Sequence, residues 1–249
     1  MALVHSFEKV GNKLFKYRGQ IPYILFLMAI PVIYLKSYQH YFESEKFRWI
    51  LLAVSVLVSF SGQIVRAIAV GTSNKNTSGR NTEEQIADAL NTKGIYSMLR
   101  HPLYLGNYLM WIGIVLYVGS VYFFVIVSLL FWIYYERIMF AEERYLERKF
   151  GEKYVEWSNS IPAFIPSMKN YQKSSIPFSL KTVLRREYPG ISATILSFLF
   201  VEILRNLFHQ HPFEWTNCYT ILIIVALLIS LILRSLKHYT KILTEEDRS

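Results

Sequence analysis

The chain has 249 residues, of which 53% are hydrophobic and 16% aromatic, and its formal net charge is +9. Length alone would allow one ordinary soluble domain, but the long apolar runs predict an all-α integral membrane bundle that crosses the bilayer several times. In a soluble protein this positive charge would suit nucleic acid. Here the charges lie between apolar runs, which favours the lipid bilayer with its anionic headgroups and no nucleic-acid partner. The single cysteine, Cys218, excludes an intramolecular disulfide framework and a multi-cysteine metal site, and we expect no metal.

The first seventy residues predict a surface segment followed by two spanning helices. Residues 1–20 mix basic with aromatic side chains, as in helices that lie on a membrane surface, and they lack the pattern of a cleavable signal peptide. Apolar runs over 21–35 and 47–70 then predict two spans. Arg66 lies about one turn from the end of the second run, where we expect it to snorkel to the headgroups in preference to lining a site. Small residues that predict close helix packing follow it: Ala67, Ala69 and Gly71.

Residues 71–93 are the most loop-like part of the chain and fit a lid over a site as well as a plain linker. Within this loop Thr82, followed by two glutamates, predicts the cap of a short helix that runs to Leu90. Pro102 then forbids a continuous helix through the arginine and histidine before it, but it suits the first turn of a new helix.

Apolar runs over 103–117 and 121–135, joined by a Gly-Ser pair, predict a tight helical hairpin. A hairpin returns the chain to the side of the membrane where it began. We therefore expect Arg100 and His101 to meet the residues that follow the second run. Those residues, 136–150, keep a helical pattern but become amphipathic.

The C-terminal third predicts a basic linker over 169–187 and two further spans over 190–208 and 217–236. Within the first of these spans Glu202 and Arg205 are three residues apart, so they are placed to pair on one helix face. Charged residues inside a span are costly enough that a role in a substrate groove is the alternative.

These runs together predict a polytopic bundle of about six spanning helices. Lysine and arginine gather on one side of it, beside the N terminus, before the hairpin, after the hairpin and in the C-terminal tail. Because cytoplasmic segments carry such an excess, both termini are expected in the cytoplasm, with a cofactor pocket on that side. The chain divides into an interfacial segment, two N-terminal spans, a core, and a linker with an extra helix pair: 1–20, 21–70, 71–168 and 169–249.

Two sequence blocks resemble the isoprenylcysteine carboxyl methyltransferases and their membrane-embedded relatives. The first reads Gly94-x-Tyr96-x-x-x-Arg100-His101-Pro102-x-Tyr104-x-Gly106, and the second contains Glu142-Glu143, Leu146, Phe150-Gly151, Tyr154, Ile161-Pro162 and Pro166. The blocks occur in the family's order and at its separation. The resemblance implies an enzyme that transfers the methyl group of S-adenosylmethionine. The last two spans are a departure, because the family's core does not require them.

The resemblance also implies cofactor-binding residues. S-adenosylmethionine needs a donor for its carboxylate, an acceptor for its ammonium or ribose hydroxyls, and an aromatic or aliphatic wall. Four residues match positions that border the cofactor in the family: His101, Tyr104, Glu142 and Glu143. We add two neighbouring residues, Tyr96 and Leu103, to this set.

Methyl transfer to a carboxylate or phosphate oxygen depends on alignment and on exclusion of water, and it needs no general base. An anionic acceptor does need a cation that can fork, and our catalytic candidates are Arg137 first and Arg100 second. The expected acceptor is a lipid or a lipidated molecule. A prenylcysteine carboxylate, a lipid phosphate and an amine headgroup are all compatible with the sequence.

Two other functions fit parts of the sequence. A multi-span membrane reductase of the sterol-reductase type would use NADPH, although the chain has no Gly-x-Gly-x-x-Gly fingerprint. A non-catalytic lipid-binding protein would bind neither cofactor, and it would leave the two motif blocks unexplained.

Overall fold

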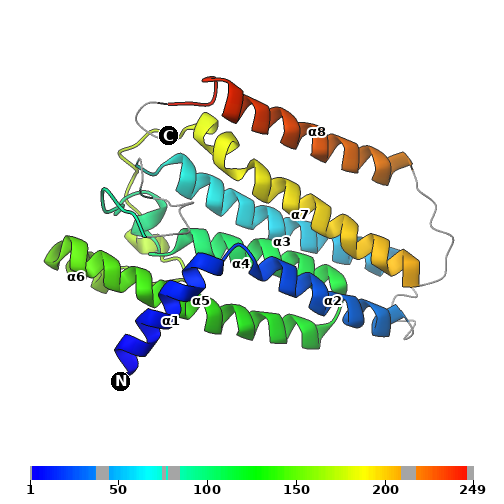
Figure 1. The fold of residues 1–249 in the computed structure, drawn as a ribbon, viewed down its shortest axis with the longest axis horizontal. Helices are drawn as coiled ribbons and strands as arrows, with labels where there is room; N and C mark the ends of the chain where they lie inside the picture. Colours follow the sequence, from blue (N-terminus) through cyan, green and yellow to red (C-terminus); the bar gives the residue numbers. More distant parts are fainter. Residues whose placement is uncertain (1, 38–44, 75–76, 78–84, 209–216, 246–249) are drawn as a thin grey trace.

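The computed structural model describes residues 2–37, 45–74, 77, 85–208 and 217–245 and is almost entirely helical (Figure 1). Its helices, in chain order, are α1 (Leu3–Tyr17), α2 (Ile21–Ser37), α3 (Glu45–Gly71), η1 (Ile95–Ser97), α4 (Pro102–Val118), α5 (Val121–Phe150), α6 (Glu152–Ser160), η2 (Met168–Asn170), α7 (Leu180–Phe208) and α8 (Asn217–Tyr239). In these ranges the only extended pairing is an isolated bridge between Gly94 and Gln172. The predicted all-α class is confirmed.

Four helices are long and apolar enough to cross a membrane: Lys46–Gly71 of α3, Val121–Phe150, Leu180–Phe208 and Ile221–Tyr239 of α8. The two remaining predicted spans form apolar helices, but Tyr23–Leu35 and Pro102–Val118 are shorter. The helix α4 is short because Pro102 occupies its first turn and Gly119, with φ of 79°, ends it in the left-handed region. The helices support an integral membrane protein, whereas the number of six spans stays a prediction.

The helix α4 lies in the middle of the bundle, where it contacts α2, α3, α5 and α7 (Figure 1). Its closest neighbour is α3. A Cβ atom added to Gly62 would lie 2.6 Å from the carbonyl oxygen of Gly106, and one added to Gly113 would lie 2.5 Å from that of Ser55. Ser59 adds a hydrogen bond of 2.8 Å to the carbonyl of Met110. The tight contact therefore occurs earlier in α3 than the small residues at its end predicted.

The predicted hairpin is present, and its second helix is much longer than its first. Ser120 caps α5 by accepting a hydrogen bond from the amide of Phe123 at 3.3 Å. The helix α5 then continues without a break through the amphipathic residues to Phe150 and ends at Gly151. The helix α1 packs across α5, and the Tyr134 hydroxyl, just before the amphipathic part, donates to the carbonyl of Leu14 at 2.7 Å.

Two local predictions were wrong. The described residues 85–90 are not helical, and Thr82, the predicted cap, lies outside the described residues. The helix α7 begins at Leu180, so the last eight residues of the predicted basic linker, 180–187, are helical. The reason is a cap that was not recognised: the Ser179 hydroxyl accepts a hydrogen bond from the amide of Thr182 at 3.1 Å.

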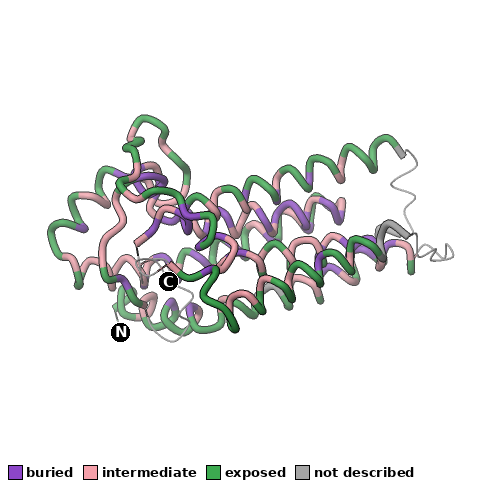
Figure 2. The backbone as a smooth tube through the Cα atoms, turned by 90° about the horizontal axis from the view of Figure 1, so that it is seen from above, coloured by how far each residue is buried: buried purple, intermediate pink, exposed green. Residues whose placement is uncertain are grey.

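The outermost helix, α8, packs against α7, and exposed residues run along the outer helices (Figure 2). Only 6% of its apolar window is buried, so lipid can cover nearly all of it. The start of α1 and the end of α8 lie at the same end of the bundle (Figure 1).

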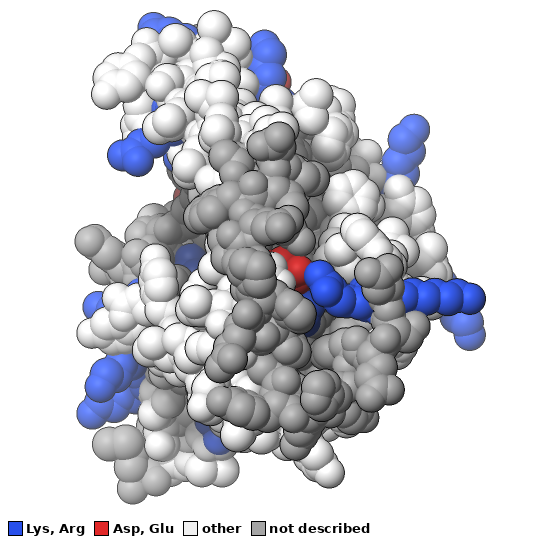
Figure 3. Space-filling view, turned by 90° about the vertical axis from the view of Figure 1, so that its right-hand side faces the viewer, with Lys and Arg blue, Asp and Glu red and all other residues white. Residues whose placement is uncertain are grey.

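The predicted pair Glu202 and Arg205 is present at the opposite end, at 3.3 Å. Glu202 also binds Arg48 of α3 at 2.8 Å, and the Tyr117 hydroxyl of α4 donates to it at 2.5 Å. Figure 3 looks onto this end and shows acidic atoms beside basic side chains near its middle. The pair does not line the cavity described below, and it joins α3, α4 and α7.

Candidate functional site

The first motif block is held in place by the chain that returns after α6. The amides of Arg100 and His101 donate to the carbonyls of Pro162 and Ala163, at 2.9 and 3.1 Å. Further back, the amide of Gly94 donates to the carbonyl of Gln172 at 2.9 Å. Gly94 has φ of 63°, which a side chain would disfavour. The loop before α4 is thus fixed by backbone contacts from a segment about 70 residues away in sequence.

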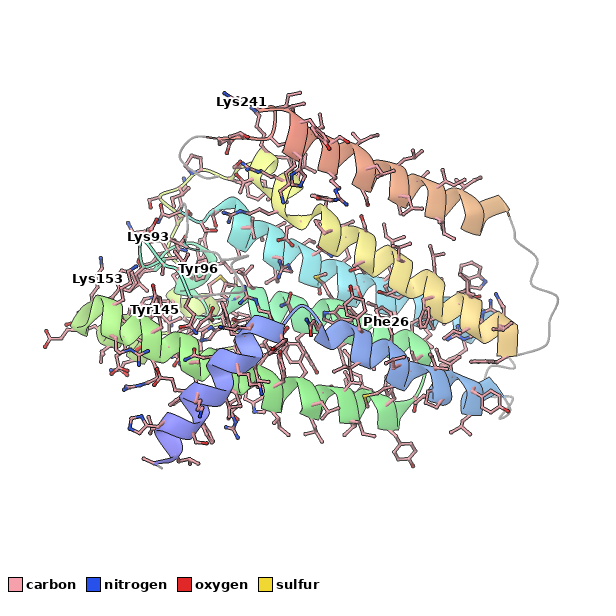
Figure 4. All side chains as sticks on the ribbon, viewed as in Figure 1. Phe26, Lys93, Tyr96, Tyr145, Lys153 and Lys241 are labelled. Carbon is pink, nitrogen blue, oxygen red and sulfur yellow. The ribbon has the colours of Figure 1, made fainter. Side chains whose placement is uncertain are left out.

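A cavity of about 420 Å³ begins at this loop and extends beside α4. At the loop end its walls are polar or aromatic and include Tyr96, Arg100, His101, Tyr104 and Glu142. Figure 4 shows Tyr96 and Tyr145, two lining residues, at the end of the bundle where α1 begins. Residues Thr77, Gln85, Ile86 and Ala87 of the predicted lid or linker also border the cavity.

His101 is the centre of the polar end. Its Nε2 lies 2.9 Å from Oε1 of Glu143, and its Nδ1 lies 3.7 Å from Oε2 of Glu142. The Tyr104 ring stacks on the imidazole, with the centroids 5.7 Å apart and the planes at 27°. The predicted meeting of the motif loop with the glutamate pair of α5 is therefore seen in the structure.

The two glutamates differ in position. Glu142 lines the cavity, whereas Glu143 does not, and Glu143 instead accepts a hydrogen bond from Nε of Arg100 at 2.8 Å. Burial, and next the nearby Glu142 carboxylate, raise the pKa of the Tyr96 phenol above its ordinary value. Tyr96 therefore stays protonated and keeps a hydroxyl that can donate. Leu103, the remaining predicted cofactor residue, also lines the cavity.

The two predicted catalytic arginines lie in different places. Arg100 lines the cavity, but its guanidinium also donates to the carbonyls of Ser158 and Ile161, both at 2.7 Å. Arg137 is absent from the lining. Its guanidinium carbon lies 3.4 Å from the centre of the Phe7 ring, and its partner Glu136 is 3.5 Å away. The helical offset explains this, because five residues turn Arg137 away from Glu142.

Beyond His101, a polar network crosses the cavity wall. Arg66 of α3 binds the Glu187 carboxylate of α7 through two nitrogens, at 2.7 and 2.8 Å, and donates to Oδ1 of Asn107 at 2.6 Å. All three residues line the cavity. The prediction that Arg66 snorkels was wrong, since a buried partner is available on α7. An arginine inside an apolar run was the available signal, but its partner lies 121 residues away in sequence.

The rest of the cavity is mostly apolar and follows α4 into the bundle. It is lined by Met110, Trp111 and Ile114 of α4 and by Leu25 and Phe131 of the adjacent helices. Ile114 is 13 residues beyond His101, which corresponds to about 20 Å at 1.5 Å per helical residue. The helix α7 contributes small residues to the same wall, Gly190, Ala193 and Thr194. One cavity thus joins a polar end to a long apolar part.

Fold and site together define an integral membrane helical bundle with one cavity that is polar near His101 and mostly apolar along α4. The family model described as phospholipid methyltransferase matches residues 49–153, which contain most of α3 and all of α4 and α5. The resemblance to the isoprenylcysteine carboxyl methyltransferase-like membrane proteins is thereby confirmed, and it is supported by individual relatives.

A protein-S-isoprenylcysteine O-methyltransferase of Schizosaccharomyces pombe is 32% identical over 75 residues, 30% of this chain and 32% of the relative. Protein-S-isoprenylcysteine O-methyltransferase B of Arabidopsis thaliana is 28% identical over 128 residues, 51% of this chain and 64% of the relative. The nickel-cobalt-cadmium resistance protein NccN of Alcaligenes xylosoxydans xylosoxydans is 32% identical over 98 residues, 39% of this chain and 43% of the relative. The matches therefore span from a third to under two thirds of these relatives. No solved structure matches the chain significantly.

Proposed function

We propose that the protein is an integral membrane methyltransferase that moves the methyl group of S-adenosylmethionine to an anionic group of a lipid or lipidated acceptor. The observation that carries this proposal is the continuous cavity, polar at His101 and apolar along α4. A polar, charged cofactor and an acceptor with a long apolar chain need such a pair of environments side by side. The methyltransferase names of the relatives support the same reaction.

The residues at the polar end fit S-adenosylmethionine. Glu142 offers an acceptor for the ammonium group or the ribose hydroxyls, and His101 and the first free amides of α4 offer donors for the carboxylate. Tyr96, Leu103 and Tyr104 supply the wall. Glu143 acts through His101 and Arg100, which makes it a positioning residue. When bound, the cofactor supplies a methyl group on a positively charged sulfur.

The charges of the lining favour an anionic acceptor. Among the described lining residues four are arginines, Arg18, Arg66, Arg100 and Arg186, and two are glutamates, Glu142 and Glu187. A third glutamate, Glu143, binds Arg100 from outside the lining, so the arginines still exceed the glutamates by one. The positive excess stabilises an anion in a site of low dielectric constant. We propose the carboxylate of an isoprenylcysteine as the first acceptor to test, because two relatives are named protein-S-isoprenylcysteine O-methyltransferases. A lipid phosphate is the second, since it shares the charge and the apolar chain.

No proton has to be removed from such an acceptor, because it is already ionised at neutral pH. The protein's task is to align the anionic oxygen with the methyl group and to exclude water. The apolar part of the cavity holds the chain of the acceptor. Arg66 holds the Glu187 carboxylate in a fixed position, and Arg100 holds that of Glu143. We further propose that both termini and the polar end face the cytoplasm, as the lysine and arginine distribution predicts.

The first test is a calorimetric titration of S-adenosylhomocysteine into the purified, detergent-solubilised protein, beside a titration with NADPH. We expect saturable binding of S-adenosylhomocysteine, weakened by His101→Ala, and no binding of NADPH. A folded protein that binds NADPH but not S-adenosylhomocysteine would replace the proposal with the reductase. A folded protein that binds neither would leave the non-catalytic lipid-binding function.

A further inference from the structure

The short helix α6 places two aromatic side chains, Tyr154 and Trp157, in the wall of the cavity. The Tyr154 hydroxyl and the Trp157 Nε1 are both buried, and neither has a hydrogen-bond partner among the described residues. Tyr154 is only 4% exposed. Neither residue takes part in the cofactor site as the sequence predicted it.

Unpartnered buried donors are unusual in folded proteins, because each costs the full free energy of its desolvation. Most polar side chains around the cavity have partners: Arg66, Arg100, His101 and Asn107 all form hydrogen bonds within the protein. Solvent cannot replace the missing partners, since both atoms are shielded from it. A molecule bound in the cavity that both side chains line is the remaining source of acceptors.

The surroundings of the two donors define what that molecule presents. The Tyr154 and Trp157 rings contact each other at 5.7 Å between centroids, with planes at 57°. Trp157 also packs against the buried cluster of Ile95, Tyr96 and Leu99. Flat aromatic walls favour a flat ring, and the two donors require acceptor atoms on its edge. A purine has both properties, since its ring nitrogens are acceptors.

We propose that Tyr154 and Trp157 form the subsite for the adenine ring of the cofactor, with their hydroxyl and indole N–H donating to its ring nitrogens. This inference rests on the proposed function, because adenine is the only purine part of S-adenosylmethionine. The bound cofactor satisfies both donors.

Tyr154→Phe tests the proposal with the least change of shape. We expect it to weaken S-adenosylhomocysteine binding about fivefold, the value of one net hydrogen bond. In the ligand-free protein it should leave the melting temperature unchanged or raise it, because an unsatisfied donor is removed. Tyr108→Phe is the matched control. Its hydroxyl has a partner at 3.0 Å, Ser128, and it does not line the cavity, so binding should stay at the wild-type value.

Analogues of S-adenosylhomocysteine identify which ring nitrogen of adenine accepts each hydrogen bond. The 1-deaza, 3-deaza and 7-deaza forms each lack one ring nitrogen. At least one analogue should bind the wild type more weakly than S-adenosylhomocysteine does. In the variant that lacks the matching donor, Tyr154→Phe or Trp157→Phe, that analogue should bind no more weakly than S-adenosylhomocysteine. Unchanged affinity in Tyr154→Phe, or equal losses for every analogue in wild type and variants, would overturn the proposal.

A lower melting temperature of ligand-free Tyr154→Phe without an effect of the analogues would also overturn it, and would assign the tyrosine a structural role. Failure of the wider proposed function has a different signature, because the wild-type protein itself would then not bind S-adenosylhomocysteine.

Discussion

Glu142 and Glu143 are neighbours in sequence with separate tasks. Successive residues of a helix point about 100° apart, so only one of the two can line the cavity. Glu142 does so, and Glu143 turns towards Arg100 and His101. The sequence motif predicted both as cofactor-binding residues. A motif marks the positions that belong to a site, but it does not show which of their side chains contacts the ligand.

Replacing Glu143 by alanine removes the common partner of Arg100 and His101. We expect S-adenosylhomocysteine to bind about tenfold more weakly, the size of a lost hydrogen bond to a charged group, and the melting temperature to fall. Calorimetry and thermal unfolding in detergent measure the two effects. Glu143→Gln keeps an oxygen acceptor and should lose less. Equal affinity in wild type and Glu143→Ala would show that the imidazole needs no such support.

Arg137→Ala should behave differently from a substitution inside the cavity. Its guanidinium lies over the Phe7 ring of α1, so the variant should weaken the attachment of α1 by about 1 kcal/mol. Methyl transfer per folded molecule should stay within about threefold of wild type, because Arg137 does not line the cavity. Radiolabelled methyl transfer measures this. A loss of a hundredfold in turnover with unchanged stability would restore Arg137 to the catalytic site.

At the scale of elements, the contact between α3 and α4 sets the shape of the cavity wall. Glycine and serine let the two backbones approach closely, which places Arg66 and Asn107 side by side.

Gly113→Ala should therefore force these helices apart. The added Cβ would meet the Ser55 carbonyl oxygen at 2.5 Å, and we expect the free energy of unfolding to fall by about 1–3 kcal/mol. Thermal unfolding in detergent gives the measurement. Gly19→Ala is the control, because a Cβ there meets nothing within 4 Å. Similar stability of the two variants would mean that the helices separate without cost.

The elements were more predictable than their ends and partners. Hydrophobic runs, Pro102 and the Gly-Ser turn gave the helices α2 to α5 because their causes are local. The start of α7 was missed, since a serine cap before a basic segment reads as linker. In the site, the motif gave the residues around His101, whereas the network of Arg66 and the donors of α6 depend on contacts distant in sequence.

At the scale of the whole molecule, the first of the extra C-terminal helices, α7, binds the core at two places along its length. Glu187 binds Arg66 beside the cavity, and Glu202 binds Arg48 and Tyr117 at the opposite end. The helix α7 is thus part of the cavity wall, although the family resemblance did not require it.

Glu202→Ala tests the contact at the end of the bundle opposite the cavity. It leaves Arg205, which is 5% exposed, without its carboxylate, and we expect a loss of about 3–5 kcal/mol in unfolding free energy. The double variant Glu202→Leu, Arg205→Leu should recover much of this loss, because both charges are gone. Thermal unfolding compares the two proteins. A double variant as unstable as the single one would show that packing, and not the charge, is at fault.

The bond between Arg66 and Glu187 also has a consequence for biosynthesis. The ribosome completes α3 long before α7, since 121 residues separate the two partners and 41 separate Arg66 from Asn107. During that interval the arginine enters the bilayer without this carboxylate, at a cost that the long apolar helix offsets. A nascent chain that stops before residue 187 carries this charge without the carboxylate that neutralises it.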